Sequence, residues 1–200
     1  MNTTNVISII DEAHDALRSA ARRLGPADLA RPSACADWSV GQVLEHAVLD
    51  QVIWAAGIDG GPGPEGDPFA PTGAPATGLS AYVDAALVRA RDAWATVDGG
   101  AAQVSTPLPQ GPQAADVAAA MAALDAAVHA WDITSSLGAP SPLTDGLAAQ
   151  LDPAARALVE PLRQWGAYAP ALAGQDGDDP AARLLRFLGR DPGRTVEARL

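Results

Sequence analysis

The fold of this chain follows from residues 114–138, which read AADVAAAMAALDAAVHAWDITSSLG. Apolar side chains recur along them at the spacing of one face of an α-helix, and this stripe consists of Val117, Met121, Leu124, Val128 and Trp131. Gly138 ends the pattern and Pro140 follows it, as is typical just beyond a helix C-terminus. We therefore expect a long helix over about residues 114–137, with its apolar stripe in the core.

Helical spacing continues on both sides of this segment. Further helices are expected over about residues 5–24, from an N-cap at Asp37 or Ser39 to near Gly57, and over residues 80–97, 144–165 and 180–188. Within the stretch 144–165 we expect a break at Asp152-Pro153, because proline removes a helical hydrogen bond and restricts the residue before it. No alternating β pattern longer than four residues is present. The predicted fold class is all-α: a four-helix bundle with additional C-terminal helices packed on it.

The connections between the first four helices are longer than tight turns require. Residues 57–78 read GIDGGPGPEGDPFAPTGAPATG, so we expect a long Gly/Pro-rich loop that either forms a lid over a site or is disordered. Residues 101–113 contain three prolines and are expected to form an extended connector. These lengths predict crossover connections. The expected organisation is a single domain over residues 1–200, with residues 140–200 as a helical extension on the bundle.

Composition limits the classes of function. Of the 200 residues, 48% are apolar and 18% are charged, which indicates a globular protein. Acidic residues outnumber basic ones by 24 to 13, for a net charge of −11, so neither a nucleic acid nor a membrane surface is an expected partner. The first residues lack a signal-peptide pattern, no apolar run is long enough to span a membrane, and a single cysteine, Cys35, fits a reducing compartment. The expected location is the cytoplasm.

The three histidines, His14, His46 and His129, all lie within predicted helices. Asp125 precedes His129 by four residues, so the two side chains share a helix face with Cβ atoms ~6 Å apart and could grip one divalent ion. Helix bundles build metal sites from such residues on different helices. This hypothesis gives a site of His46, Asp125 and His129, with Asp50 or His14 as further ligands.

A second interpretation of the same residues stays open. Each histidine could be a capped or partly exposed helical residue, with Asp125 and Asp132 solvating the outer edge of their helix. Without a metal, His129 between these two carboxylates could also act as a general base whose tautomer is fixed by a carboxylate.

Other residues also have both a chemical and a structural interpretation. Cys35 could be a reactive thiol or could serve in packing or a turn. Trp38 and Trp131 could stack on a ligand or form the core and a pocket wall. Four C-terminal arginines could meet a carboxylate-bearing substrate or thiol, or pair with acidic residues on the surface: Arg183, Arg186, Arg190 and Arg194.

Three strings of this sequence resemble those of a known superfamily. They are RPSACADWSVGQVLEHAVLDQ (residues 31–51), LDAAVHAWDITSSLG (residues 124–138) and RLLRFLGRDP (residues 183–192). The first two resemble the signature regions of the DinB-like superfamily. More closely, they resemble the actinobacterial branch that includes mycothiol-dependent maleylpyruvate isomerase and its uncharacterised metal-binding relatives. The third resembles a C-terminal string common in that branch.

The resemblance implies a DinB-like four-helix bundle that holds a divalent ion, often zinc. The histidine after the Trp-Ser-Val motif is His46, the histidine of the His-Ala-Trp-Asp string is His129, and the acidic ligand four residues before it is Asp125. The family usually has Glu at that last position, and the shorter Asp reaches about one methylene less far, which would lower metal affinity. The candidate cofactor-binding residues are Trp38, Asp50, Trp131 and Arg183.

The function that this resemblance implies is enzymatic. Zinc with three protein ligands and an open position would act as a Lewis acid and hold a low-molecular-weight thiol, such as mycothiol, as its thiolate. We therefore expect a metal-dependent thiol S-transferase or isomerase acting on a small electrophilic molecule, with His46, Asp125 and His129 as the catalytic residues. The alternatives are a metal-free biosynthetic enzyme that uses His129 and Asp125 as acid and base, and a non-catalytic ligand-binding protein. An alanine-rich bundle with exposed faces could also form a homodimer.

Overall fold

The computed structural model describes residues 3–35, 37–98 and 103–194, and these residues form helices and loops without a β-strand. The prediction of an all-α fold is therefore confirmed. A short 3-10 turn at Pro26–Asp28 lies within the connection between the first two helices. The helices are α1 (Thr3–Ala21), α2 (Val40–Asp59), α3 (Leu79–Ala95), α4 (Ala115–Ser136), α5 (Asp145–Arg163) and α6 (Pro180–Phe187).

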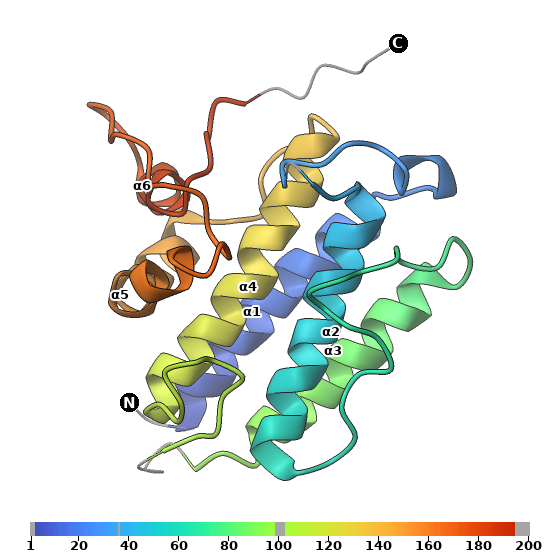
Figure 1. Cartoon of the computed structure of the whole chain (residues 1–200), viewed down its shortest axis with the longest axis vertical. Helices are drawn as coiled ribbons and strands as arrows, with labels where there is room; N and C mark the ends of the chain where they lie inside the picture. The colour runs from blue at the N-terminus through green and yellow to red at the C-terminus, as the bar shows by residue number, and fades with distance from the viewer. Residues whose placement is uncertain (1–2, 36, 99–102, 195–200) are drawn as a thin grey trace.

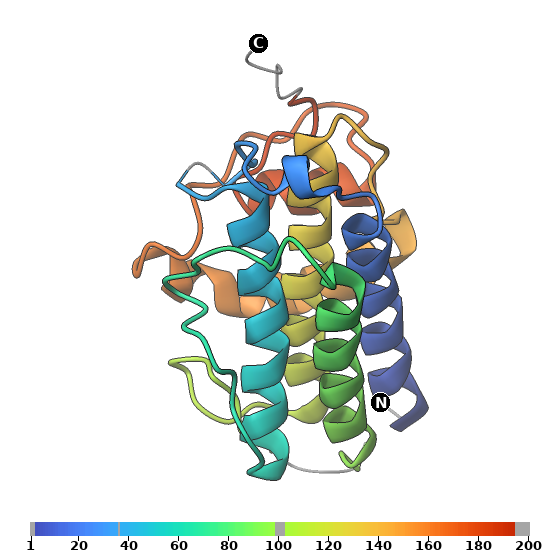
Figure 2. The same ribbon diagram turned by 90° about the vertical axis from the view of Figure 1, so that its right-hand side faces the viewer.

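Helices α1 to α4 form a four-helix bundle (Figure 1). Helix α4 packs against both α1 and α2, and α3 packs against the same two helices from the other side of the bundle. Helices α1 and α4 run in one direction and α2 and α3 in the other, so residues 60–78 must return along the whole bundle between α2 and α3 (Figure 2). The predicted crossover connection is this segment.

Local signals explain where α2 begins and ends. Ser39 is its N-cap, and the Ser39 side chain and Gln42 side chain each bond the other residue's backbone N–H. At the other end Gly60 adopts φ 69°, a left-handed conformation that glycine reaches without steric cost. The helix thus continues two residues beyond the expected end at Gly57, and the long loop begins at residue 60.

Helix α4 is buried on all sides rather than along one stripe. It contacts α1, α2 and α5, and alanine occupies many of its positions, which lets the neighbouring helices approach closely. A polar side chain on this helix is therefore placed inside the protein, where it needs a partner.

Helix α5 corrects one prediction, because it runs without a break through Asp152-Pro153. Pro153 lies on the exposed side, and so does Ala149, whose carbonyl loses its helical partner and can accept a hydrogen bond from water instead. The opposite side is a continuous apolar face that includes Leu147, Leu151 and Leu158, all buried. Pro161 is a second proline inside α5, and burial of the apolar face against α4 and α6 outweighs the hydrogen bonds lost at both prolines.

The loop of residues 60–78 is held against α2 by hydrogen bonds from three positions. The Ala74 N–H donates to the Gly41 carbonyl over 2.9 Å, and the Gln42 side chain donates to the Pro71 carbonyl over the same distance. The Glu45 carboxylate accepts from the Gly73 N–H. In this structure the loop therefore lies along the first half of α2.

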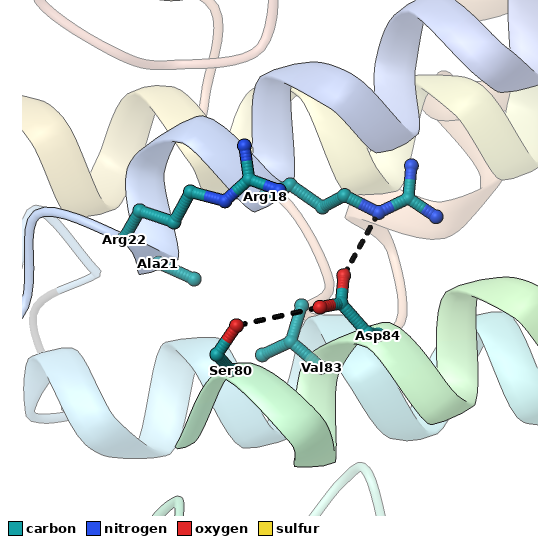
Figure 3. Close-up of a pocket in the computed structure, with 6 residues that line it drawn as sticks. All are labelled: Arg18, Ala21, Arg22, Ser80, Val83 and Asp84. Atoms are coloured by element: carbon teal, nitrogen blue, oxygen red, sulfur yellow. Dashed lines mark hydrogen bonds and ion pairs between the residues drawn. The ribbon is translucent and has the colours of Figure 1, made fainter. Parts of the chain in front are cut away.

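Helices α1 and α3 are joined by an ion pair that spans a small surface pocket (Figure 3). Arg18 on α1 lies 3.1 Å from the Asp84 carboxylate on α3, and the Ser80 hydroxyl donates to the same carboxylate. None of the predicted site residues lines this pocket. Among the described residues, no helix is both long enough and apolar enough to cross a membrane.

Candidate metal centre

Three of the predicted site residues converge between α2 and α4. His46 comes from α2, and Asp125 and His129 come from α4, one helical turn apart. The Asp125 Oδ1 atom lies 3.4 Å from His46 Nε2 and 3.3 Å from His129 Nε2. The two imidazole rings meet edge to face, with their centroids 4.8 Å apart. All three side chains are largely buried, with 11–16% of their surface exposed.

The outer nitrogen of each imidazole ring has its own hydrogen-bond acceptor. His46 Nδ1 donates to the Pro68 carbonyl over 2.7 Å, and a carbonyl can only accept, so the proton of neutral His46 is on Nδ1. His129 Nδ1 donates to the Asp132 carboxylate over 2.8 Å. Each ring therefore directs the lone pair of Nε2 toward Asp125. Histidine ligands of metal ions are held in this way by an acceptor on the far side of the ring.

The centre therefore gathers acceptors without a donor between them. Two Nε2 lone pairs face one carboxylate oxygen, and the second oxygen, Asp125 Oδ2, is buried and has no hydrogen-bond partner in the part of the chain that the structure describes. Three acceptors at this spacing require a cation, which is either an added proton or a metal ion.

The spacing of these atoms fits a metal ion. Ligand atoms at about 2.0–2.1 Å from a tetrahedral zinc ion lie about 3.3–3.4 Å from one another, and the carboxylate oxygen is 3.3 and 3.4 Å from the two nitrogens. A direct charge-assisted hydrogen bond would be shorter, at about 2.7–2.9 Å. Whether Asp125, one methylene shorter than the usual Glu, lowers metal affinity stays a prediction.

Without an ion, the charge balance is met by a proton on His129. Burial disfavours charge on both His129 and Asp125, but the attraction between the two charges is stronger. Asp125 therefore raises the pKa of the His129 imidazole well above its usual range. Although Asp125 is also buried, the two histidines hold the pKa of its carboxyl well below the usual range. A metal ion and this proton therefore compete for the same place.

Behind His129, a second layer of residues surrounds Asp132. Its carboxylate has no exposed surface and accepts two hydrogen bonds from Arg190, with Nε to Oδ1 at 2.8 Å and Nη2 to Oδ2 at 2.7 Å. The Cys35 thiol donates to Oδ2 over 3.2 Å. Although burial opposes ionisation, Arg190 holds the pKa of Asp132 well below its usual range. The interpretation of Asp132 as a solvating residue on an outer edge is therefore wrong.

Two more of the predicted residues adjoin the centre. The Trp38 ring packs against the His46 ring, with centroids 4.8 Å apart. Asp50 lies one turn beyond His46 on α2 and accepts a hydrogen bond from the Trp54 indole over 3.0 Å. Burial, together with the Asp125 charge, raises the pKa of Asp50 to about 7, so this carboxyl can exchange a proton at neutral pH.

Three other predicted residues lie outside the centre. His14 bonds the Gln51 side chain over 3.0 Å in the bundle core, and burial lowers the pKa of His14 to about 4, so it is not a ligand of this centre. Arg183 is exposed on α6, where it donates to the Asp178 carbonyl. Trp131 lines a separate cavity of about 260 Å³ beside Arg190 and Arg194.

Sequence reasoning missed three contributors to this region. The Pro68 carbonyl orients His46 from the crossover loop, and only its distance to the ring reveals that role. Arg190 was considered as a ligand for a substrate or a surface partner, whereas it bonds a buried carboxylate. Tyr168, in the segment after α5, is packed against the core, and burial raises its pKa to about 12, with Asp125 adding to the effect.

This fold and this centre define a class of protein: helical bundles that gather two histidines and one carboxylate between two antiparallel helices. Residues 10–134 match the family "Mycothiol maleylpyruvate isomerase N-terminal domain", and the chain belongs to this family. The match confirms the family that the three sequence strings resemble. It ends within α4, so α5, α6 and the segment carrying Arg190 lie beyond it.

The relatives found among known proteins have no assigned activity. Two uncharacterised proteins, from two strains of Mycobacterium tuberculosis, are each 31% identical to this chain over 183 residues, which cover 89% of this chain and 93% of the relative. No solved structure matches the chain. At the level of the family, the function is related to that of a mycothiol-dependent isomerase.

Proposed function

We propose that this protein is a divalent-metal-dependent enzyme, with zinc as the fitting ion, that transfers a low-molecular-weight thiol to a small electrophilic molecule or uses that thiol to isomerise it. The observation that carries the proposal is the spacing of 3.3 and 3.4 Å between Asp125 Oδ1 and the two Nε2 atoms, which leaves room for an ion and is too long for strong hydrogen bonds. Membership of the mycothiol maleylpyruvate isomerase family supports the choice of thiol.

In this proposal, His46, Asp125 and His129 are the ligands. A zinc ion held by them would supply Lewis acidity and would lower the pKa of a bound thiol so that the thiolate is present at neutral pH. The Pro68 carbonyl and the Asp132 carboxylate bond the two Nδ1 atoms, so both Nε2 atoms are directed inward, where a metal ion would displace the extra proton of His129. In the metal-free centre, burial and the Asp125 charge raise the pKa of Asp50 to about 7. A bound divalent ion would lower this pKa, so Asp50 would be ionised and could accept the proton that a thiol releases.

A metal-free enzyme is the second candidate, and one observation favours it. Because the pKa of His129 is raised, the imidazole of the metal-free centre keeps its extra proton at neutral pH. It would then act as a general acid toward a substrate, with Asp125 stabilising the imidazolium, rather than as the general base that the sequence suggested. A bound metal and a protonated His129 exclude each other, so metal content decides between the two candidates.

The test is the metal content of protein purified without an affinity-tag metal, measured by elemental analysis. We expect about one zinc or similar ion per chain in the wild type, and a loss of this ion in His129→Ala and Asp125→Asn. Asp116→Asn is the matched control, because Asp116 lies on the same helix but in its first turn, where its carboxylate bonds the Val117 N–H. Protein that holds less than about a tenth of an ion and takes up no added zinc would exclude the metal-dependent enzyme.

Once the ion is present, the thiol is tested directly. Wild-type protein loaded with zinc is mixed with low-molecular-weight thiols, mycothiol among them, and small electrophilic substrates. We expect thiol consumption or substrate isomerisation that Asp125→Asn abolishes and Asp116→Asn retains. Equal rates in Asp125→Asn and the wild type would contradict a role for this centre in the reaction.

A further inference from the structure

A second cluster of metal-binding side chains lies on the other side of the same imidazole ring. The ligand atoms of Cys35, His129 and Asp132 all lie within 4.8 Å of one another. The Cys35 sulfur is 3.2 Å from Asp132 Oδ2, and His129 Nδ1 is 2.8 Å from the same oxygen. Thiolate, imidazole and carboxylate are all ligands that zinc accepts. His129 therefore faces one candidate ligand set at Nε2 and another at Nδ1.

A fixed cation already occupies the second cluster. The Arg190 guanidinium bonds both oxygens of Asp132, at 2.8 and 2.7 Å, and its Nη2 atom lies 3.9 Å from the Cys35 sulfur. The arginine is largely buried, with 14% of its side chain exposed, and stays protonated at all accessible pH values. Among the described residues, no arginine is paired with Asp125, and its second oxygen has no hydrogen-bond partner.

We propose that Arg190 determines which nitrogen of His129 binds the metal. It takes the place that a second ion would occupy beside Asp132, and its charge repels a divalent cation from that side. The metal is thereby confined to Nε2, with His46 and Asp125, and Cys35 stays a free thiol.

What this arrangement contributes to the protein rests on the proposed function, in which an external thiol binds the metal ion. An internal cysteine thiolate on the ion would compete with the external thiol for the open coordination position. By keeping Cys35 off the metal, Arg190 leaves that position to the thiol co-substrate. The residue lies in the segment after α6, so a part of the chain beyond the family match of residues 10–134 controls the centre.

Loss of the guanidinium should open the second cluster. In Arg190→Met the buried Asp132 carboxylate loses its counter-charge, while Cys35 and His129 Nδ1 stay beside it. A divalent ion can then bind: a metal–sulfur bond forms, and the thiol proton and the Nδ1 proton are released to solvent.

Cobalt(II) is the probe, because a cobalt–thiolate bond gives a charge-transfer absorption that nitrogen and oxygen ligands do not give. Metal-free protein is titrated with cobalt(II), and the ions bound per chain are measured together with the spectrum. The variants are Arg190→Met, Arg190→Lys, which keeps a positive charge, and the double variant Cys35→Ser/Arg190→Met. Circular dichroism and thermal unfolding show that each variant is folded.

We expect the wild type to bind no more than one ion and to show no thiolate band. Arg190→Met should bind one ion more than the wild type and show the band, Arg190→Lys should lack the band, and the double variant should lose it. A thiolate band or two bound ions in the wild type would overturn the inference, and so would a folded Arg190→Met without the band. If Arg190→Met does not fold, Arg190→Gln, a neutral hydrogen-bond donor, takes its place with the same expectation.

Failure of the proposed function gives a different result. A wild type that binds no ion contradicts the metal-dependent enzyme alone, and a thiolate band that arises only in Arg190→Met then still supports the role of Arg190. A wild type that binds one ion through Cys35 contradicts the role of Arg190 and leaves a metal-binding protein.

Discussion

Replacement of Arg190 by Met should lower the free energy of unfolding by about 3 kcal/mol in metal-free protein. Asp132 has no exposed surface, and its carboxylate is bonded by both Nε and Nη2 of Arg190. Removing one partner of a buried ion pair costs roughly 3–5 kcal/mol, because a buried charge is left without compensation. The hydrogen bonds from His129 and Cys35 to Asp132 persist, which places the loss at the lower end of that range.

The assay is equilibrium unfolding in urea with a chelator present, supported by thermal melts. For a domain of this size, about 3 kcal/mol corresponds to a fall of roughly 6–12 °C in Tm. A double-mutant cycle with Asp132→Asn isolates the pair: Arg190→Met should cost far less when Asp132 is already neutral. Strictly additive losses, or a loss below about 1 kcal/mol for Arg190→Met alone, would show that the ion pair does not stabilise the fold as argued.

Three further outcomes are expected. Asp132→Asn should weaken zinc binding roughly 10–100-fold, because the acceptor that fixes the His129 tautomer loses its charge. Competition with a chromogenic chelator measures this affinity, and an unchanged affinity would show that the tautomer needs no charged acceptor. The pKa of His14 in the folded protein is about 4, below its ordinary value, so as the pH falls His14 is protonated in the unfolded chain first. Protonation of His14 should therefore lower the free energy of unfolding by about 3 kcal/mol between about pH 7 and pH 4. Urea unfolding at both pH values checks this, and an equal loss in His14→Gln would refute it. Gly189→Ala should unfold at a lower temperature, because Gly189 has φ 79° and an added Cβ would lie 2.7 Å from the Ala169 carbonyl oxygen. An unchanged Tm in thermal unfolding would refute this close contact.

Local patterns predicted the features of this protein that depend on neighbours along one helix. The apolar spacing in residues 114–138 predicted the central helix, and the four-residue step from Asp125 to His129 placed both side chains on one face, because helix geometry alone sets that relation. The start of α2 was predicted at an N-cap of Asp37 or Ser39 for the same reason, since capping involves only the first turn, and the structure selects Ser39. The long connections indicated a crossover because a tight turn cannot be made from so many residues.

Contacts between distant segments were decided by the tertiary structure alone. Whether His46 or His14 meets Asp125 depends on which faces of α1, α2 and α4 point toward one another, and helical periodicity leaves several rotations open. The uninterrupted α5 depends on the apolar face that α4 and α6 cover, which outweighs the local effect of Pro153. The tautomers of His46 and His129 depend on the Pro68 carbonyl and on Asp132, and the charge of Asp132 is balanced by Arg190, 58 residues further along the chain. The residue types were readable from the sequence, but buried charges find partners through space, and the packing of the helices determines which partners are within reach.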